Sequence, residues 1–240
     1  MGKEFELRRE VQLPGTPEQV WAAIATERGV ASWLWPMDIE PREGGAVSEG
    51  GVVTVWDPPH RFANRAERED GWFNALEFIV EAHDGGGAVL RCVHSGIFDE
   101  DWDAQYDGAN QGWNFYLHTL AQYLQYFPGQ AATYIGADAP PSSADPAAWP
   151  ALQRELGLAD DVEPGASVRF SLDDSTRIEG ELDYLTHNLL GIRTSDALYR
   201  FHSRWSLGMP LGVGHHLFAD DVDRDETRSS WQAFLNRVTI

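Results

Sequence analysis

The chain of 240 residues carries 38 acidic and 18 basic side chains, which gives a formal net charge of −20 at pH 7. This charge repels phosphate backbones and anionic lipid headgroups, so it argues against nucleic acids and membrane surfaces as partners. Hydrophobic residues make up 42% of the chain and aromatic residues 12%, which excludes a disordered protein and allows either one large domain or two compact ones.

The N-terminal segment predicts a strand and gives no sign of export. Residues 4–13 largely alternate apolar and polar side chains, a pattern typical of a half-buried strand. The start of the chain lacks the apolar run of a signal peptide, and the single cysteine, Cys92, has no partner for an internal disulfide. We therefore expect a cytoplasmic protein that does not insert into a membrane.

A short helix is predicted after this strand, followed by a meander of strands. Thr16 suits an N-cap, Pro17 suits the first helical position, and Gln19 completes a capping box. Between residues 43 and 93, pairs and triplets of glycine separate strand-like runs, which indicates antiparallel hairpins. These runs cover residues 52–56, 76–80 and 89–93.

A long amphipathic helix should close the first half. From Asp107 to Phe127 apolar side chains recur at helical spacing, and Pro128 followed by Gly129 marks the end. The apolar stripe comprises Trp113, Tyr116, Leu117, Leu120, Leu124 and Phe127. Such a stripe has to be buried, and the meander is the surface of this half that can bury it.

A change of composition divides the chain. Residues 136–147 are rich in Ala, Pro, Ser and Asp, as expected of a linker or an exposed loop. We therefore predict one domain over residues 1–130 and a smaller α+β domain over residues 131–240. The second domain should contain a helix near 149–156, a terminal helix, and strands near 168–172, 178–185, 189–194, 198–205 and 213–218.

The terminal helix resembles the long helix of the first half. Its pattern Trp231-x2-Phe234-Leu235-x2-Val238 matches Trp113-x2-Tyr116-Leu117-x2-Leu120, and a run of aspartates precedes each helix. The second half is therefore either a degenerate repeat of the first in reduced form or an independent segment with convergent patterning.

Three segments carry a family resemblance. They are Thr16-Pro17-Glu18-Gln19-Val20-Trp21, Trp56-Asp57-Pro58-Pro59-His60-Arg61-Phe62, and Gly112-Trp113-x3-Leu117-x2-Leu120-x2-Tyr123-Leu124. In this order they resemble the activator-of-Hsp-ATPase-homologue branch of the START-like helix-grip superfamily, also called SRPBCC, over about residues 4–128. The resemblance implies an α+β fold in which an antiparallel sheet wraps around a long C-terminal helix, with a cavity between them.

No metal or cofactor is expected. Asp99-x-Asp101-x-Asp103 resembles the start of a calcium loop, but Ala104 stands where glycine is needed and Asn110 where a bidentate glutamate should close the loop. Asp221-x-Asp223-x-Asp225 fails in the same way. Both clusters precede predicted helices, whose N-terminal ends favour carboxylates, so we assign them to capping.

The superfamily contains lipid carriers, hormone receptors, polyketide cyclases and ring hydroxylase components, so the fold alone does not select a function. We favour a protein that encloses a small apolar or amphipathic molecule, because common catalytic signatures are absent from the sequence. A cyclase- or hydrolase-like enzyme using the same cavity, and a protein-interaction or chaperone-regulator module, remain alternatives. The oligomeric state is left open. The predicted ligand-binding residues are Trp113, Tyr116, Leu117, Leu120, Leu76, Phe78 and His94.

Overall fold

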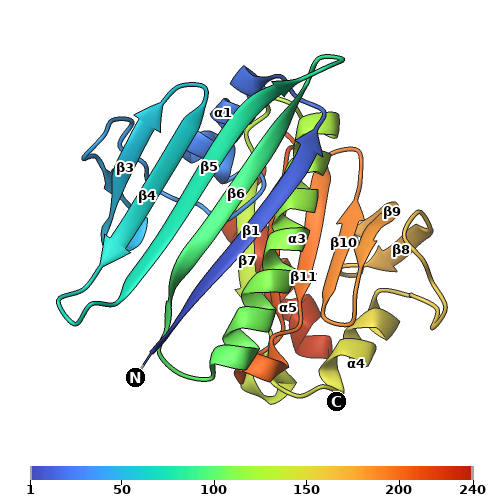
Figure 1. Ribbon diagram of the computed structural model, residues 1–240. Coiled ribbons are helices and arrows are strands. Elements are labelled where there is room, and N and C mark those ends of the chain that lie inside the picture. The colour runs from blue at the N-terminus through green and yellow to red at the C-terminus, as the bar shows by residue number, and fades with distance from the viewer. Residues whose placement is uncertain (1, 239–240) are drawn as a thin grey trace. The chain divides into compact units, whose positions relative to one another are not determined.

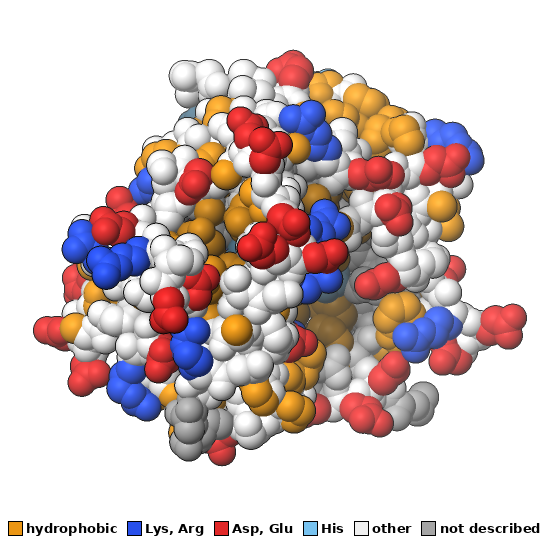
Figure 2. Space-filling view, turned by 180° about the vertical axis from the view of Figure 1, so that it is seen from behind, with side chains coloured by type: hydrophobic (Ala, Val, Ile, Leu, Met, Phe, Trp, Pro, Cys, Tyr) orange, Lys and Arg blue, Asp and Glu red, His pale blue; other side chains and the backbone are white. Residues whose placement is uncertain are grey.

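The computed structural model describes residues 2–238, which form two compact units. The first unit ends at Ala131 and the second begins at Ala132. Each contains one antiparallel six-stranded sheet with helices, so the fold class is α+β (Figure 1). Carboxylates are spread over the face shown in Figure 2, with basic side chains among them. No helix in the described part of the chain combines the length and hydropathy needed to cross a bilayer.

The first unit is built on a sheet with the strand order β1-β6-β5-β4-β3-β2. Its strands are β1 (Lys3–Leu13), β2 (Ala46–Val47), β3 (Gly51–Asp57), β4 (Arg61–Glu67), β5 (Phe73–His83) and β6 (Gly87–Phe98). The strand at the N-terminus and the three central runs of the meander are confirmed. Neither β2 nor β4 was predicted from the sequence.

The helices of the first unit are α1 (Pro17–Ala25), α2 (Glu27–Val30), the short 3-10 helix η1 (Ser48–Gly50) and α3 (Trp102–Tyr126). The predicted capping box of α1 is present, with Thr16 and Gln19 bonded to each other's backbone. The long helix α3 lies against β1 and β6 (Figure 1). Arg9 of β1 fastens it there, because its Nε donates to Oδ1 of Asn114, at 2.8 Å.

The second unit has the strand order β7-β12-β11-β10-β9-β8. Its strands are β7 (Thr133–Asp138), β8 (Ser167–Ser171), β9 (Arg177–Leu185), β10 (Leu189–Arg193), β11 (Ala197–His202) and β12 (Gly212–Leu217). Its helices are η2 (Pro141–Ser143), α4 (Ala148–Glu155), η3 (Trp205–Leu207) and α5 (Arg224–Arg237).

The predicted linker is corrected at its start. Residues 136–138 belong to β7, which pairs with β12 from Thr133 to Asp138. Backbone pairing at the edge of the sheet outweighs the loop-like composition, because Ile135 is fully buried and holds the strand on the core.

The two units share one topology. In each, a first strand is followed by a helix and five antiparallel strands, and the last of these pairs with the first strand. A helix then closes the unit, with α3 against β1 and α5 against β7. The second unit therefore has the form expected of a reduced repeat.

The two aspartate clusters differ in what they do. Asp223 caps α5 as predicted, because its side chain accepts hydrogen bonds from the backbone N–H groups of Asp225 and Glu226. Asp101 occupies the N-cap of α3 without a side-chain cap hydrogen bond, and its φ of 43° is left-handed. Capping by the first cluster is therefore corrected at Asp101.

Candidate ligand-binding site

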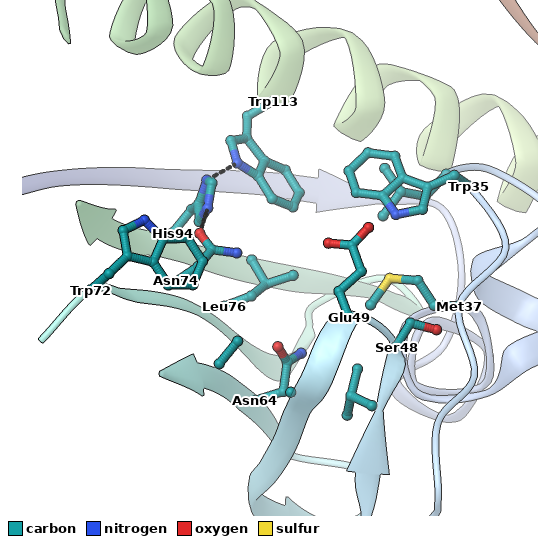
Figure 3. A pocket seen from close by; sticks show the side chains of 14 residues that line it. Trp35, Met37, Ser48, Glu49, Asn64, Trp72, Asn74, Leu76, His94 and Trp113 are labelled. Carbon is teal, nitrogen blue, oxygen red and sulfur yellow. Dashed lines mark hydrogen bonds between the residues drawn. The ribbon is translucent and has the colours of Figure 1, made fainter. Parts of the chain in front are cut away.

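A cavity of about 180 Å³ lies in the first unit (Figure 3). Its walls come from strands β4 to β6, from α3, and from the connection between α2 and β3. The lining residues are Leu34, Trp35, Met37, Val47, Ser48, Glu49, Gly51, Asn64, Ala66, Trp72, Asn74, Leu76, His94 and Trp113. An apolar cavity of roughly 150 Å³ can hold benzene, so this volume suits one aromatic ring or a small bicyclic group.

Strand register explains where the cavity lies. We call Leu7, His94, Leu76, Asn64 and Val53 the cavity row, because pairing places these side chains opposite one another across five strands. The next row deeper, the packed row, contains Cys92, Phe78 and Phe62. All three are at most 2% exposed. Cavity and solid core are thus adjacent rows on one face of the sheet.

His94 is held by two hydrogen bonds. Its Nδ1 accepts from the indole Nε1–H of Trp113 at 2.9 Å, and its Nε2 lies 2.7 Å from Oδ1 of Asn74. Because Nδ1 accepts, the ring hydrogen is on Nε2 and is donated to Asn74. Burial lowers the pKa of His94 to about 4. The imidazole is therefore neutral at pH 7, and both nitrogens are engaged.

Two further polar groups face the cavity. The Nδ2 atom of Asn64 is buried and has no hydrogen-bond partner among the described residues. Figure 3 shows its carboxamide directed into the cavity, with the carboxylate of Glu49 on another wall beside Trp35. Glu49 has a left-handed backbone, with φ at 64°, a conformation that costs a residue other than glycine on the order of 1 to 3 kcal/mol.

Within residues 2–238, no three His, Cys, Asp or Glu side chains gather into a group that could hold a metal ion. The polar side chains among the residues that line the cavity are Ser48, Glu49, Asn64, Asn74 and His94.

Residues 14–125 match the model of the family described as activator of Hsp90 ATPase homolog 1-like protein. The first unit is therefore similar to this family over most of its length. The resemblance predicted from the sequence is thus confirmed. No curated protein matches the chain.

Several solved structures resemble part or nearly all of this chain. Protein MLL2253 from Mesorhizobium loti is 23% identical, covers 51% of this chain and 98% of its own, and has a TM-score of 0.44. The Aha1 dimer from Colwellia psychrerythraea is 18% identical over 50% of this chain and 96% of its own, with a TM-score of 0.42. DynU16, from the dynemicin biosynthetic locus, is 16% identical over 97% of this chain and 95% of its own, with a TM-score of 0.43.

The first unit brings part of the predicted site together. Leu76, His94 and Trp113 line the cavity. Tyr116 lies beside it, with its ring 6.2 Å from that of Trp113 and 5.5 Å from that of Trp35 between centroids.

The other three predicted residues lie in the core. Phe78 belongs to the packed row and contacts the rings of Trp33 and Trp113. Leu117 and Leu120 are one and two turns beyond Trp113 on α3 and are at most 4% exposed. Helical spacing identified the buried stripe, but only its first turn reaches the cavity.

Sequence reasoning missed several lining residues. Trp35, Met37 and Glu49 come from an irregular connection that has no periodicity to interpret. Asn64 lies in β4, a strand that was not predicted. Once β4 is recognised as a strand, Asn64 stands between Phe62 and Ala66 on one face of it. A polar side chain at that position was the signal that could have identified Asn64 as a site residue.

The second unit contains a matching row, and the four residues of this row are at most 9% exposed. Ile135 and His215 pair across β7 and β12, as Leu7 and His94 pair across β1 and β6. Tyr199 comes next, with its ring 5.1 Å from that of His215, and it pairs with Ile192 of β10. Tyr199 thus takes the place of Leu76, and Ile192 the place of Asn64. Trp231 contacts His215, as Trp113 contacts His94.

Proposed function

We propose that the first unit binds a small apolar or amphipathic molecule in the cavity over the cavity row. The observation that carries this proposal is a cavity of about 180 Å³ with predominantly aromatic and aliphatic walls and a few convergent polar groups. Ligand pockets in proteins have this composition. Exposed Trp35, at 41%, lies at the rim and offers an apolar surface to whatever part of a ligand extends outward.

The polar groups support binding rather than acid–base catalysis. His94 is the histidine of the cavity, and a general acid or base needs a nitrogen free to exchange a proton with substrate. Both of its ring nitrogens are instead bonded to Trp113 and Asn74. The lowered pKa makes protonation near neutral pH still less favourable.

A protein-interaction role would rest on exposed apolar surface. Trp205, Leu207 and Met209 are between 38% and 43% exposed at η3 of the second unit. Nothing in the described structure indicates what would cover them, so they support no second proposal. A cytoplasmic location stays a prediction from the sequence.

The experiment uses the difference in side-chain size at one matching position, which is Leu76 in the first unit and Tyr199 in the second. Ethylbenzene is titrated into the full chain while the indole N–H signals of Trp35 and Trp113 are followed by nuclear magnetic resonance. We expect saturable binding in the wild type and none in Leu76→Tyr, because the second unit accommodates a tyrosine at the matching position. Ala75→Tyr, on the opposite face of β5, is the matched control and should bind normally. Absence of binding by the wild type would overturn the proposal.

A further inference from the structure

The polar side chains of the cavity differ in which atoms already have a hydrogen-bond partner in the protein. Asn64 presents a buried Nδ2 donor that no described protein group accepts. Asn74 has its Oδ1 engaged by His94, so the group it can offer to a ligand is its N–H2 donor. Asn64 pairs with Leu76, and Asn74 lies two residues from Leu76 on the same strand face. Two amide donors thus sit on neighbouring rows of one wall.

An unpaired buried donor is costly, and a ligand oxygen that accepts its hydrogen removes this cost. A site built to hydrogen-bond a particular ligand group rejects an analogue that lacks the group, since the donor is then left unpaired. The wall formed by β4 and β5 therefore favours molecules with an acceptor oxygen.

The charges of the lining residues further restrict the chemical class of the ligand. Among the described lining residues there is no Lys or Arg, and Glu49 contributes a carboxylate. A ligand carboxylate or phosphate would lose water without gaining a cation, and it would face a like charge. Glu49 lies at the wall with a left-handed backbone, and strained residues of this kind concentrate at ligand sites.

We propose that the cavity selects uncharged aromatic or alicyclic molecules bearing a carbonyl-type acceptor oxygen, which Asn64 recognises, and that Glu49 discriminates against their carboxylate counterparts. This selectivity rests on the proposed binding function. It assigns Asn64 and Glu49 roles that the hydrophobic pattern of the sequence did not reveal.

The test uses three probes of one shape: acetophenone, ethylbenzene and benzoate. Their dissociation constants are measured by nuclear magnetic resonance titration of the full chain and of Asn64→Val, which removes the amide and keeps a strand-forming side chain. We expect Asn64→Val to weaken acetophenone binding about tenfold while ethylbenzene binding is retained. An unchanged ratio of the two affinities would overturn the role of Asn64.

Glu49 is tested with benzoate. In the wild type we expect benzoate to bind at least about tenfold more weakly than acetophenone, and Glu49→Gln to narrow this gap about threefold or more. Glu67→Gln, at the exposed end of β4, is the matched control and should leave the gap unchanged. Equal binding of benzoate and acetophenone by the wild type would refute the role of Glu49.

The outcomes separate the two proposals. If all three probes bind the wild type and Asn64→Val leaves their relative affinities unchanged, the cavity binds ligands and the selectivity proposal is wrong. If none of the probes binds at any concentration reached, both proposals are wrong.

Discussion

His94 lines the cavity and also contributes to the stability of the first unit through its hydrogen bonds. It donates to Asn74 and accepts from Trp113, so it joins β6 both to β5 and to α3. Protonating Nδ1 would break the bond to Trp113 and place a charge in an apolar wall. Because burial disfavours the charged form, the pKa of His94 is lowered from 6.5 to about 4.

A pH dependence of stability follows. Between pH 6.5 and about 4 the unfolded chain binds a proton at His94 that the folded chain does not, so this contribution to stability is complete above pH 6.5 and is lost as the pH falls. His94→Gln can keep both hydrogen bonds without titrating. We expect it to lower the slope of unfolding free energy against pH by up to about 1.4 kcal/mol per pH unit, measured by urea denaturation. An identical slope in the variant would contradict this assignment.

At the scale of elements, we expect substitutions at the N-caps of α3 and α5 to have opposite effects on stability. Asp223 accepts two backbone hydrogen bonds, so Asp223→Ala should destabilise the second unit by about 1 kcal/mol. Asp101 makes no side-chain cap bond and has a left-handed φ, so Asp101→Gly should be neutral or stabilise by up to about 1 kcal/mol. Urea denaturation of the two variants gives both values. Equal destabilisation by the two changes would show that Asp101 also acts as a cap.

Elements were predictable from sequence where one local signal dominates. The capping box of α1, the stripe of α3 and the alternation in β1 each involve neighbours in sequence, and all three are confirmed. Three strands were missed. β2 has only two residues, β4 lacks a clear alternation of apolar and polar side chains although it pairs with its neighbours β3 and β5, and β7 is defined by pairing with β12, far along the chain. Residues 136–138 have a loop-like composition and become a strand only through pairing with β12.

The site was less predictable than the fold, for a reason of geometry. Periodicity identifies which side chains are buried, but a cavity is a place where buried side chains fail to fill space. Phe78 and Leu76 are both inward-facing residues of β5, and only the register with β4 and β6 distinguishes a packed row from one beside a cavity. The contributions of Trp35 and Glu49 depend on the path of an irregular connection.

For the whole molecule, the two rows show how one topology gives a row beside a cavity in the first unit and a buried row in the second. The larger Tyr199 takes the place of Leu76, and apolar Ile192 takes the place of Asn64. The connection from α1 to β2, residues 26–45, also exceeds the one from α4 to β8, residues 156–166. The additional length supplies Leu34, Trp35 and Met37 to the cavity wall.

If the rows are equivalent, exchanging one residue should move the binding site. Tyr199→Leu removes a buried ring beside His215 and Trp231 and should destabilise the second unit by about 2 kcal/mol. It should also create an apolar cavity that binds ethylbenzene, since engineered cavities of this kind bind small aromatic molecules. We therefore expect one molecule per chain in the wild type and two in Tyr199→Leu. The double variant Leu76→Tyr, Tyr199→Leu should bind one, reported by the indole signal of Trp231 in place of that of Trp113. If the double variant folds and binds none, the cavity depends on the longer connection of the first unit and not on the residues of the row.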